Sequence, residues 1–443
     1  MEFKSNHHIL HNPIKLNSIM KVLWFSLSPC NSIKRNNSSH VIQGWMISLE
    51  EELKKNTDIQ LEVAFFSETY EKPFEFEQVK YYPMYRNILS PQYGINRIRE
   101  RFIKPAIKDK KSIDIMLDII KKSQPNIIHI HGTEEAFGLI TNFIHDIPII
   151  FSIQGLISPY KEKYFTGIPQ NIAYKLDSIS DRIKGMGIKR QYNTFCYKAE
   201  REKHYLRHAK YILGRTFWDQ YITELFNPQR TYFTVNEILR KPFYQSQWNK
   251  KQFNNTIHLV SIVSIGIYKG YETLLKAALL LKQNAQFNFE WEVIGYLPDS
   301  KYASMIHRMT KIDPLICNIN FHGMLDANQI VNKLIQSDIY CHVSHIENSP
   351  NSVCEAMILG MPIIASNTGG TASLLENDKE GILYQDGDPY ILAGSIIKLV
   401  SNFTLARQMG IEARKRALER HNRQNVVREL LYAYNQVLNN DGK

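Results

Sequence analysis

Short apolar segments recur along the second half of this 443-residue chain, and their spacing limits the folds that it can adopt. Stretches with a helical pattern separate them at intervals of about 20–30 residues, the spacing that parallel strands with crossover helices need. The segments are residues 257–263, 289–295, 319–323, 338–344, 362–366 and 382–384. We therefore expect an α/β domain with a doubly wound parallel sheet in this half of the chain.

The first half contains apolar segments of the same kind, at residues 21–26, 59–66, 126–132 and 147–155. A chain of this length is too long for one hydrophobic core, so we predict a second α/β domain. The predicted order is a polar, disordered extension over 1–19, an N-terminal domain over 20–244, a polar linker over 245–256, a C-terminal domain over 257–420, and a helix over 421–443 that crosses back to the N-terminal domain.

The composition limits the kinds of partner that we expect for this protein and the cell compartment in which we expect it. The chain carries 54 lysine and arginine residues against 43 acidic ones, and the net charge of +11 favours an anionic partner. No nucleic-acid-binding motif is present, so we do not expect that partner to be a nucleic acid. No apolar run approaches the ~20 residues of a membrane span, and residues 20–30 make a poor secretory signal. Five scattered cysteines fit a reducing compartment, so we expect a cytoplasmic protein without disulfides.

A strand, a loop and a helix are predicted to meet around two carboxylates, Glu347 and Glu355. Ser349 is a good N-cap, and Pro350 suits the first helical position because proline has no N–H to leave unpaired. Gly360 is typical of a helix end. Glu347 then lies in the loop before the helix, and Glu355 lies on the helix itself.

The start of this predicted helix offers a phosphate site. Ligands of open α/β sheets bind beyond the carboxyl ends of the strands, and a helix that begins there presents free N–H groups, here Asn351, Ser352 and Val353. Glu355 would then accept hydrogen bonds from ribose hydroxyls, and Glu347 from those of a sugar. The alternative is a capping box of Ser352 and Glu355, which would make Glu355 a structural residue.

A lysine in a glycine-flanked loop follows the first strand of the C-terminal domain. Lys269, between Gly266 and Gly270, can reach the oxygens of a diphosphate while the glycines admit close approach. The same loop could equally be a plain turn. The chain has no G-x-G-x-x-G after its first strand and no P-loop, which disfavours a conventional NAD or FAD site.

Two strands of the N-terminal half end in polar residues at one predicted sheet edge. They end in His129, His131, Gly132 and Thr133, and in Gln154 and Gly155. Side chains alternate along a strand, so both histidines point the same way, and His131 lies nearer the carboxyl end. Two histidines could suggest a metal, but no third ligand is evident. We favour a histidine that faces a cleft and expect no metal.

Residues 93–111 have the pattern of one helix that is strongly basic. Its cationic side chains are Arg97, Arg99, Arg101, Lys104, Lys108, Lys110 and Lys111. Such a run is typical of a solvated helix face. The alternative is contact with an anionic membrane surface.

Four motifs together resemble glycosyltransferase family 4, the "group 1" retaining transferases. Glu347 and Glu355 match the E-x7-E motif, and EAMILGMPIIASNTGG resembles the EA-x3-G-P-V-(I/V)-A-x3-GG signature that follows it. IYKGYETLLKAA is similar to the KG-centred diphosphate loop, and NIIHIHG to the V-H-x-H-G strand. The motifs keep the family's order across residues 20–438. IHIHGTE, FSIQGL, GRTFWD and VNEILRKPFY further resemble a branch from bacterial surface-polysaccharide clusters.

This resemblance implies the GT-B fold, in which two Rossmann-like, doubly wound parallel-sheet domains face each other across a cleft. The N-terminal domain would bind the acceptor and the C-terminal domain the nucleotide-sugar, and transfer would retain the anomeric configuration without a metal or other cofactor. The implied catalytic residues are Glu347 and His131. The implied donor-binding residues are Lys269, Gly270, Glu355, Ser349, Asn351 and Ser352, and the acceptor-side loops contain Gly132, Thr133, Gln154 and Gly155.

The chain departs from the family near the lysine loop. Many relatives carry an arginine five or six residues before the lysine, and those positions hold Ser264 and Val263 here. Another cation must then contact the diphosphate. Arg215 and Arg240, at predicted strand or loop ends in the facing domain, are the candidates.

We therefore expect a retaining hexosyltransferase that uses a UDP- or GDP-sugar and extends a glycan or polyprenyl-diphosphate-linked acceptor. The resemblance places it in capsule, O-antigen (lipopolysaccharide) or exopolysaccharide synthesis, as a cytoplasmic or peripheral membrane protein. Two alternatives stay open. One is a non-catalytic nucleotide-sugar-binding or assembly protein, which the missing arginine favours. The other is a GT-B sugar-nucleotide epimerase, which the motif order disfavours.

Overall fold

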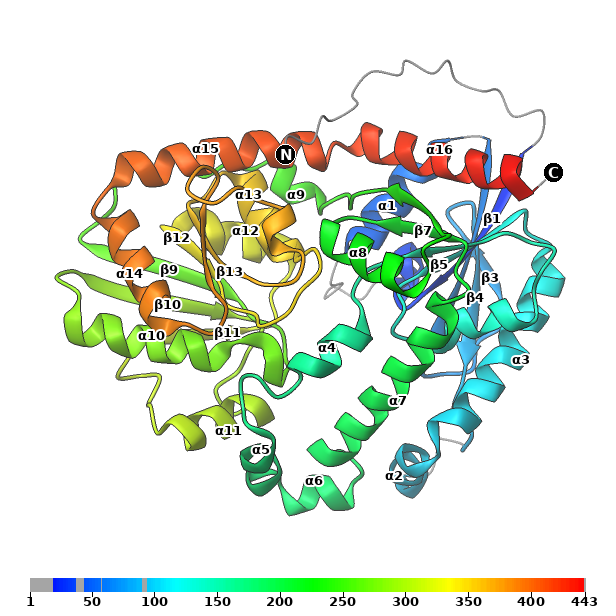
Figure 1. Cartoon of the computed structure of the whole chain (residues 1–443), viewed down its shortest axis with the longest axis horizontal. Coiled ribbons are helices and arrows are strands. Elements are labelled where there is room, and N and C mark those ends of the chain that lie inside the picture. Colours follow the sequence, from blue (N-terminus) through cyan, green and yellow to red (C-terminus); the bar gives the residue numbers. More distant parts are fainter. Residues whose placement is uncertain (1–18, 37–43, 57, 90–93, 442–443) are drawn as a thin grey trace.

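The computed structural model describes residues 19–36, 44–56, 58–89 and 94–441, which form two α/β domains (Figure 1). The predicted extension over 1–19 lies, apart from Ile19, outside the described residues. The first sheet has the strand order β3-β4-β2-β1-β5-β6-β7-β8, and only the β3–β4 pair is antiparallel. Its strands are β1 (Met20–Ser26), β2 (Ile59–Ser67), β3 (Phe74–Phe76), β4 (Val79–Tyr85), β5 (Ile127–His131), β6 (Ile149–Ser152), β7 (Tyr211–Gly214) and β8 (Thr231–Thr234).

Some helices of this part of the chain cover both faces of the sheet, and others pack against the second domain (Figure 1). They are α1 (Trp45–Leu53), α2 (Gly94–Phe102), α3 (Pro105–Ser123), α4 (Ile157–Lys163), α5 (Gln170–Leu176), α6 (Ile179–Ile183), α7 (Ile188–Leu206), α8 (Phe217–Phe226) and α9 (Lys241–Tyr244), with 3₁₀ turns η1 (Cys30–Asn36) and η2 (Ala136–Asn142). The single helix predicted over 93–111 is wrong. The chain breaks before Pro105, because a proline disfavours helical geometry at the preceding residue, and α3 then runs on to Ser123.

The second sheet has six strands in the order β11-β10-β9-β12-β13-β14, and every pair is parallel. The strands are β9 (Thr256–Ile262), β10 (Asn288–Ile294), β11 (Ile319–Gly323), β12 (Ile339–His342), β13 (Ile363–Asn367) and β14 (Ile382–Gln385). The helices are α10 (Tyr271–Asn284), α11 (Lys301–Thr310), α12 (Ala327–Gln336), α13 (Asn351–Leu359), α14 (Pro389–Val400), α15 (Phe403–Arg420) and α16 (Arg423–Asp441), with 3₁₀ turns η3 (Ile267–Lys269) and η4 (Thr371–Ser373). The predicted parallel sheet is confirmed.

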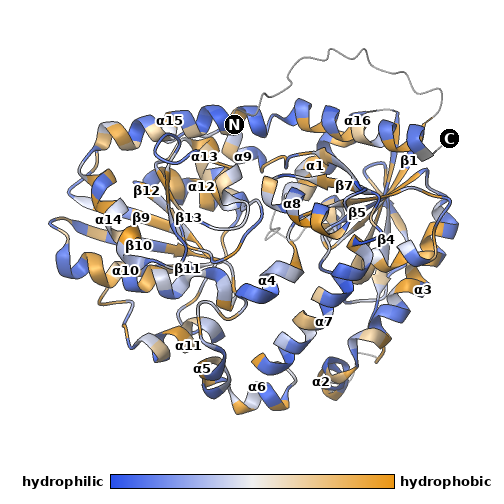
Figure 2. Ribbon diagram, in the orientation of Figure 1, coloured by the Kyte–Doolittle hydropathy of each residue, from blue (hydrophilic) through white to orange (hydrophobic). Residues whose placement is uncertain are grey.

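The strands read as continuous apolar runs because helices bury both of their faces. In β1, Val22 and Trp24 pack in one buried cluster, and Leu23 and Phe25 pack in the cluster on the opposite face. Successive side chains of a strand point to opposite faces, so a sheet covered twice needs apolar residues at every position. Along the covering helices, hydrophobic residues alternate with hydrophilic ones (Figure 2).

The last two helices run along the same edge of both domains (Figure 1). α15 packs beside α13 in the second domain, and α16 packs beside α1 in the first. Buried side chains of α16, including Leu430 and Tyr434, belong to the hydrophobic core of the first domain. The chain therefore returns to the first domain after completing the second.

The segment from α4 to the start of α7 bridges the two domains. Tyr164, Ile168 and Ala173 are buried in the same cluster as the core residues of the second domain. Lys301 of α11 adds an ion pair, 2.9 Å from Asp177. This bridge holds the carboxyl ends of the two sheets face to face.

Among the described residues, none of the helices alone has the length and apolar composition of a membrane span. Residues 389–400 and 403–440 meet those criteria only when taken together, across a bend of 103°.

Tyr434 makes the polar contact that fixes α16 to the first sheet. Its hydroxyl accepts from Trp24 Nε1 at 3.1 Å and lies 2.7 Å from His129 Nδ1. Tyr434→Phe keeps the ring but leaves two buried polar groups unpaired, so the free energy of unfolding should fall by about 1–3 kcal/mol. Denaturant unfolding measures this change. The control Tyr390→Phe, at an exposed ring of α14, should change it by less than about 0.5 kcal/mol; equal effects would contradict the assignment.

Candidate active site between the domains

The loop after β12 leads into α13 at the carboxyl end of the second sheet. α13 begins at Asn351 with Pro350 as its N-cap, and Gly360 ends it in a left-handed conformation with φ of 81°. The predicted end is confirmed, whereas the predicted cap at Ser349 is wrong. The Ser349 hydroxyl instead donates to Glu237 Oε1 at 2.6 Å, so it joins the loop to the first domain.

Glu347 of this loop forms an ion pair with Lys269, which lies in the turn after β9, with 2.5 Å between Lys269 Nζ and Glu347 Oε1. Burial alone would lower the pKa of Lys269, but the adjacent carboxylate raises it above its ordinary value, so the amine stays charged. Gly270 follows with φ of 74°, and a Cβ there would lie 1.7 Å from the Val343 carbonyl oxygen. Glycine is therefore required for the lysine turn to lie against the loop after β12.

A cavity of about 430 Å³ opens between the domains around this ion pair. Of the residues predicted for the site, those that line it are Gln154, Gly155, Arg215, Lys269, Glu347, Ser349, Asn351 and Ser352. The second domain contributes an ammonium group and the N-terminus of α13, and the first domain contributes a guanidinium group. Both kinds of group stabilise an anion.

Arg215 and Arg240, the two candidates for the missing cation, occupy different places. Arg215 lines the cavity, with its guanidinium stacked over Trp45 at 4.3 Å from the ring centroid. Arg240 is outside the lining and binds Glu355 through two bonds of 2.6 and 2.7 Å. Only Arg215 shares the cavity with Lys269.

Glu355 is buried on α13 behind the cavity lining. Burial raises the pKa of its carboxyl, against the opposing effect of Arg240. Its partner is Arg240, and α13 has no side-chain cap, so the capping-box alternative is wrong. The bidentate pair holds the carboxylate in one orientation.

His131 and His129 do point the same way, with ring centroids 3.8 Å apart. His131 lies beneath Trp45, whose ring centroid is 5.9 Å away, and does not reach the cavity. Burial lowers the pKa of His131, and neither of its ring nitrogens has a hydrogen-bond partner among the described residues. It is a neutral imidazole one layer behind the cavity wall.

Gly132 and Thr133 also lie behind the lining. The Thr133 hydroxyl lies against Glu202 and donates to the Gly155 carbonyl oxygen at 3.0 Å. This bond ties the loop after β5 to the loop after β6. The predicted acceptor-side residues thus form one connected rim, of which Gln154 and Gly155 reach the cavity.

Two groups of three possible metal ligands occur among the described residues, and neither includes the predicted histidines. Glu237, Cys354 and His421 are buried together. Arg215 and Arg420 lower the pKa of Glu237 to about 2 despite its burial, and these positive charges oppose a divalent cation. The other group, His258, Glu290 and Glu292, is partly exposed at one face of the second sheet.

The loop that carries Glu347 is also held from the first domain. The Thr216 hydroxyl donates to Asn348 Oδ1 at 2.5 Å, and Asn348 Nδ2 donates to Asp219 Oδ2 at 2.9 Å. Thr216 and Asp219 also form the capping box of α8. The local sequence pattern does not predict this contact, although T-F-W-D at 216–219 is a recognisable helix start.

His345, two residues before Glu347, is held from both sides. Its Nδ1 lies 2.7 Å from Asp386 Oδ1, and its Nε2 lies 2.6 Å from Glu272 Oε1. Burial opposes the charge, but the two carboxylates raise the pKa of His345 to about 9. The imidazolium therefore joins α10, the loop after β12 and the loop after β14 at neutral pH.

Comparison with known proteins agrees with this geometry. Residues 245–416, which contain Lys269, Glu347 and α13, match the family model for glycosyl transferases group 1. The chain is 28% identical over 193 residues to an uncharacterized glycosyltransferase, MJ1069, of Methanocaldococcus jannaschii, covering 43% of this chain and 48% of that protein. It is 26% identical over 149 residues to the amylovoran biosynthesis glycosyltransferase AmsK of Erwinia amylovora, covering 32% and 36%. The matches thus span about half or less of these relatives.

Solved structures share the whole architecture. A sucrose-phosphate synthase from Thermosynechococcus elongatus superposes with a TM-score of 0.66 at 15% identity, covering 94% of this chain and 98% of that one. Anabaena Alr3699/HepE, solved in complex with UDP and glucose, superposes with a TM-score of 0.62 at 15% identity, covering 93% and 98%. The two facing parallel-sheet domains are therefore the expected GT-B fold.

The ion pairs of His345 predict a pH dependence of stability. A pKa raised on folding adds stability that is complete below the unfolded pKa of about 6.5 and is lost as the pH rises through about 9. The stability advantage of the wild type over His345→Gln should shrink steadily from pH 6.5 to 9.5. Thermal unfolding across this range measures the advantage. His208→Gln, at an exposed histidine, should show no such trend; a constant advantage for His345 would contradict its charged state.

Proposed function

We propose that this protein is a retaining hexosyltransferase that moves a sugar from a UDP- or GDP-sugar to a glycan acceptor. The observation that carries the proposal is the Lys269–Glu347 ion pair beside the N-terminus of α13, in a cavity between the domains. It lies inside the segment that matches the group 1 glycosyltransferases. A cation, a helix N-terminus and a carboxylate in one cavity suit the diphosphate and the sugar hydroxyls of one ligand.

The diphosphate would lie between Lys269, the N–H groups at the start of α13 and Arg215 of the facing domain. Negative charge develops on a leaving nucleoside diphosphate, and these preorganised groups stabilise it without a metal. Arg215 would replace the arginine that many relatives carry where this chain has Ser264 and Val263.

Glu347 would accept hydrogen bonds from the donor sugar once the diphosphate draws Lys269 away. Glu355 would bind the ribose, because a carboxylate held by Arg240 keeps lone pairs for further hydrogen bonds. His131 lies beneath Trp45, so its contact with the reaction centre would require that ring to move. In the transfer, the acceptor oxygen bonds to the anomeric carbon, the bond from that carbon to the phosphate oxygen breaks on the same face, and the leaving oxygen takes the acceptor's proton.

The polysaccharide class follows from the relatives. One is named for amylovoran biosynthesis, and a Staphylococcus aureus relative, 29% identical over 101 residues, is named a capsular polysaccharide biosynthesis glycosyltransferase. These names support the proposal that this protein acts in the synthesis of capsule, exopolysaccharide or lipopolysaccharide. Its acceptor would be linked to a polyprenyl diphosphate.

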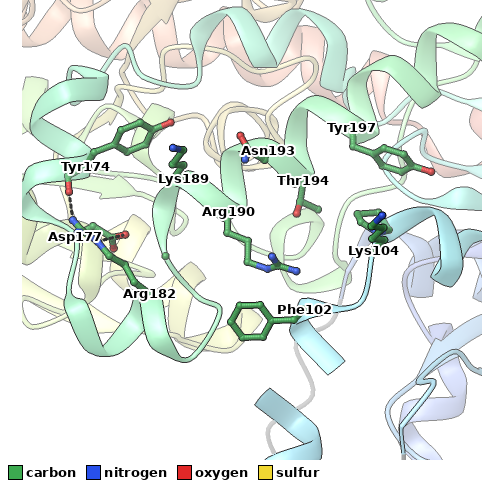
Figure 3. A pocket seen from close by; sticks show the side chains of 12 residues that line it. Phe102, Lys104, Tyr174, Asp177, Arg182, Lys189, Arg190, Asn193, Thr194 and Tyr197 are labelled. Carbon is green, nitrogen blue, oxygen red and sulfur yellow. Dashed lines mark hydrogen bonds and ion pairs between the residues drawn. The ribbon is translucent and has the colours of Figure 1, made fainter. Parts of the chain in front are cut away.

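A basic groove with exposed apolar side chains supports action at the inner face of the cytoplasmic membrane. A cavity of about 770 Å³ lies between α2, the start of α3 and the segment from α5 to α7 (Figure 3). Lys104, Arg182, Lys189 and Arg190 line it, with Asp177 as the one acidic residue of the lining.

Apolar side chains surround this groove. Phe102, Ile179 and Ile183 expose 49%, 73% and 70% of their surface, which is high for large apolar residues. Cations beside exposed apolar side chains are the pattern of a surface that binds anionic lipid headgroups and inserts shallowly.

The test of the function is a donor screen that reads nucleotide release with and without a lipid-linked oligosaccharide fraction. We expect release from one donor, stimulated by the lipid fraction and lowered at least about 100-fold in Glu347→Gln. Arg215→Ala should raise the donor KM and lower kcat. Arg240→Ala should act through Glu355, so it should raise the donor KM by a larger factor than it lowers kcat. Binding of a nucleotide-sugar without any release would contradict the enzyme and favour a binding protein.

The membrane proposal predicts binding to vesicles that contain phosphatidylglycerol, weakened by salt, and none to phosphatidylcholine alone. Ile179→Asp with Ile183→Asp should lower vesicle binding by about tenfold or more, because it places carboxylates where apolar side chains would insert. Cosedimentation measures the bound fraction. The matched control Ile391→Asp with Ile411→Asp, at exposed isoleucines of α14 and α15, should bind as the wild type does; equal losses would contradict the groove as the contact surface.

A further inference from the structure

Glu134 is a carboxylate of the cavity wall that the sequence motifs do not use. It follows Gly132 and Thr133 in the loop after β5, and it lines the cavity on the side of the first domain. Its Oε2 atom is buried and has no hydrogen-bond partner among the described residues. A buried polar atom without a partner is unusual in a folded protein, so the position of this carboxylate at the cavity wall calls for an explanation beyond the fold.

The neighbouring carboxylates differ from Glu134 because each has a structural partner. Glu135 is bound by Arg86 and Lys198, at 2.7 and 2.6 Å. Glu202 accepts from the backbone N–H groups of Ile157 and Ser158, at 2.9 and 2.7 Å. Of the three, only Glu134 faces the cavity. Two of these carboxylates therefore hold loops of the fold, and the third, Glu134, lines the cavity.

Glu134 packs beside two glycines, and one of them, Gly132, is required to make room for its carboxylate. A Cβ at Gly132 would lie 2.2 Å from Glu134 Oε2, and a Cβ at Gly155 would lie 3.5 Å from Glu134 Oε1. Gly132 has φ of 90°, a conformation that other residues rarely adopt. These glycines belong to the two loops that were predicted to face the acceptor. Because both loops lie beside Glu134, its carboxylate gives them a polar group that can bind the acceptor.

Glu134 also lies on the opposite wall from the donor-binding groups of the second domain. Lys269, Glu347 and the start of α13 all come from the second domain. Tyr160 of α4 is buried near both carboxylates, and both contribute to raising its pKa, although burial is the main cause. A ligand bound by Glu134 would therefore be a neighbour of the sugar bound by Glu347, with the Tyr160 ring close to both.

We propose that the Glu134 carboxylate accepts a hydrogen bond from a hydroxyl of the acceptor sugar and so selects and positions the acceptor. This inference rests on the proposed transferase function and deepens it. The hydroxyl concerned is a neighbour of the one that attacks, so the transfer step and its proton balance stay as given above. Glu134 is an acceptor-binding residue, separate from the donor-binding groups.

The ionisation of Glu134 supplies a readout that a merely structural residue would not move. Burial, with the charges of Glu202 and Glu135, raises its pKa to about 7, against the opposing effect of Lys198. The other groups that face it are the phenols of Tyr160, Tyr205 and Tyr268, which are neutral at this pH. Acceptor binding should therefore strengthen as the pH rises through about 7, because the ionised form accepts the stronger hydrogen bond.

The test compares the wild type with Glu134→Gln, using the preferred donor and a panel of methyl glycosides together with a lipid-linked oligosaccharide fraction. We expect Glu134→Gln to raise the acceptor KM about 10- to 100-fold at pH 8, the range for loss of a hydrogen bond to a charged group. The donor KM and donor hydrolysis without acceptor should stay unchanged. The rise of kcat/KM for the acceptor between pH 6 and 8 should disappear. Glu135→Gln is the matched control, because it removes an adjacent carboxylate that faces away from the cavity, and it should keep the pH-dependent rise.

The possible outcomes distinguish failure of the role proposed for Glu134 from failure of the proposed transferase function. A wild type that transfers sugar while Glu134→Gln keeps its acceptor KM and its pH profile would overturn the role of Glu134 alone. A variant that loses acceptor and donor binding together would also overturn it, since that result marks a structural residue. A wild type that transfers to no acceptor would overturn the proposed function, and this inference with it.

Discussion

The loop between β12 and α13 is the element on which the rest of the site depends, because polar contacts from both domains hold it. His345 joins it to two loops of its own domain. Asn348 and Ser349 join it to Asp219 and Glu237 of the first domain. Glu347 lies between these contacts, so its position relative to the facing domain is set by the interface. A change in the angle between the domains would move Glu347 relative to Arg215 and Glu134.

The interface would let one cavity bind both the donor and the acceptor of the proposed transfer. The second domain supplies groups that suit a diphosphate and a hexose. The first supplies Arg215, the loop residues Gln154 and Gly155, and Glu134, whose Oε2 atom has no hydrogen-bond partner among the described residues. The two walls meet where the segment from α4 to α7 packs into the core of the second domain. Lys269 and Glu347 neutralise each other, and this pairing lets both charges be buried in the cavity.

The sequence predicted the second sheet and the place of the residues at its edge more fully than those of the facing wall. Each apolar run of the second half became a strand, because parallel strands covered twice have a pattern that local composition reveals. Lys269, Glu347 and the start of α13 are local features of a strand, a turn and a helix. The place of Arg240 on Glu355, of His131 beneath Trp45, and of Asn348 between Thr216 and Asp219 depends on contacts between distant segments, which no local pattern encodes. Glu134 was missed for the same reason, since only the fold shows that it lacks a partner.

The central claim is that the cavity between the domains binds the nucleoside diphosphate, and a crystal structure with bound UDP or GDP tests it most directly. We predict that the two phosphates lie between Lys269, Arg215 and the N-terminus of α13, with the Lys269–Glu347 ion pair opened. A nucleotide found in the basic groove between α2 and α7, or one that leaves Lys269 bound to Glu347, would contradict the account.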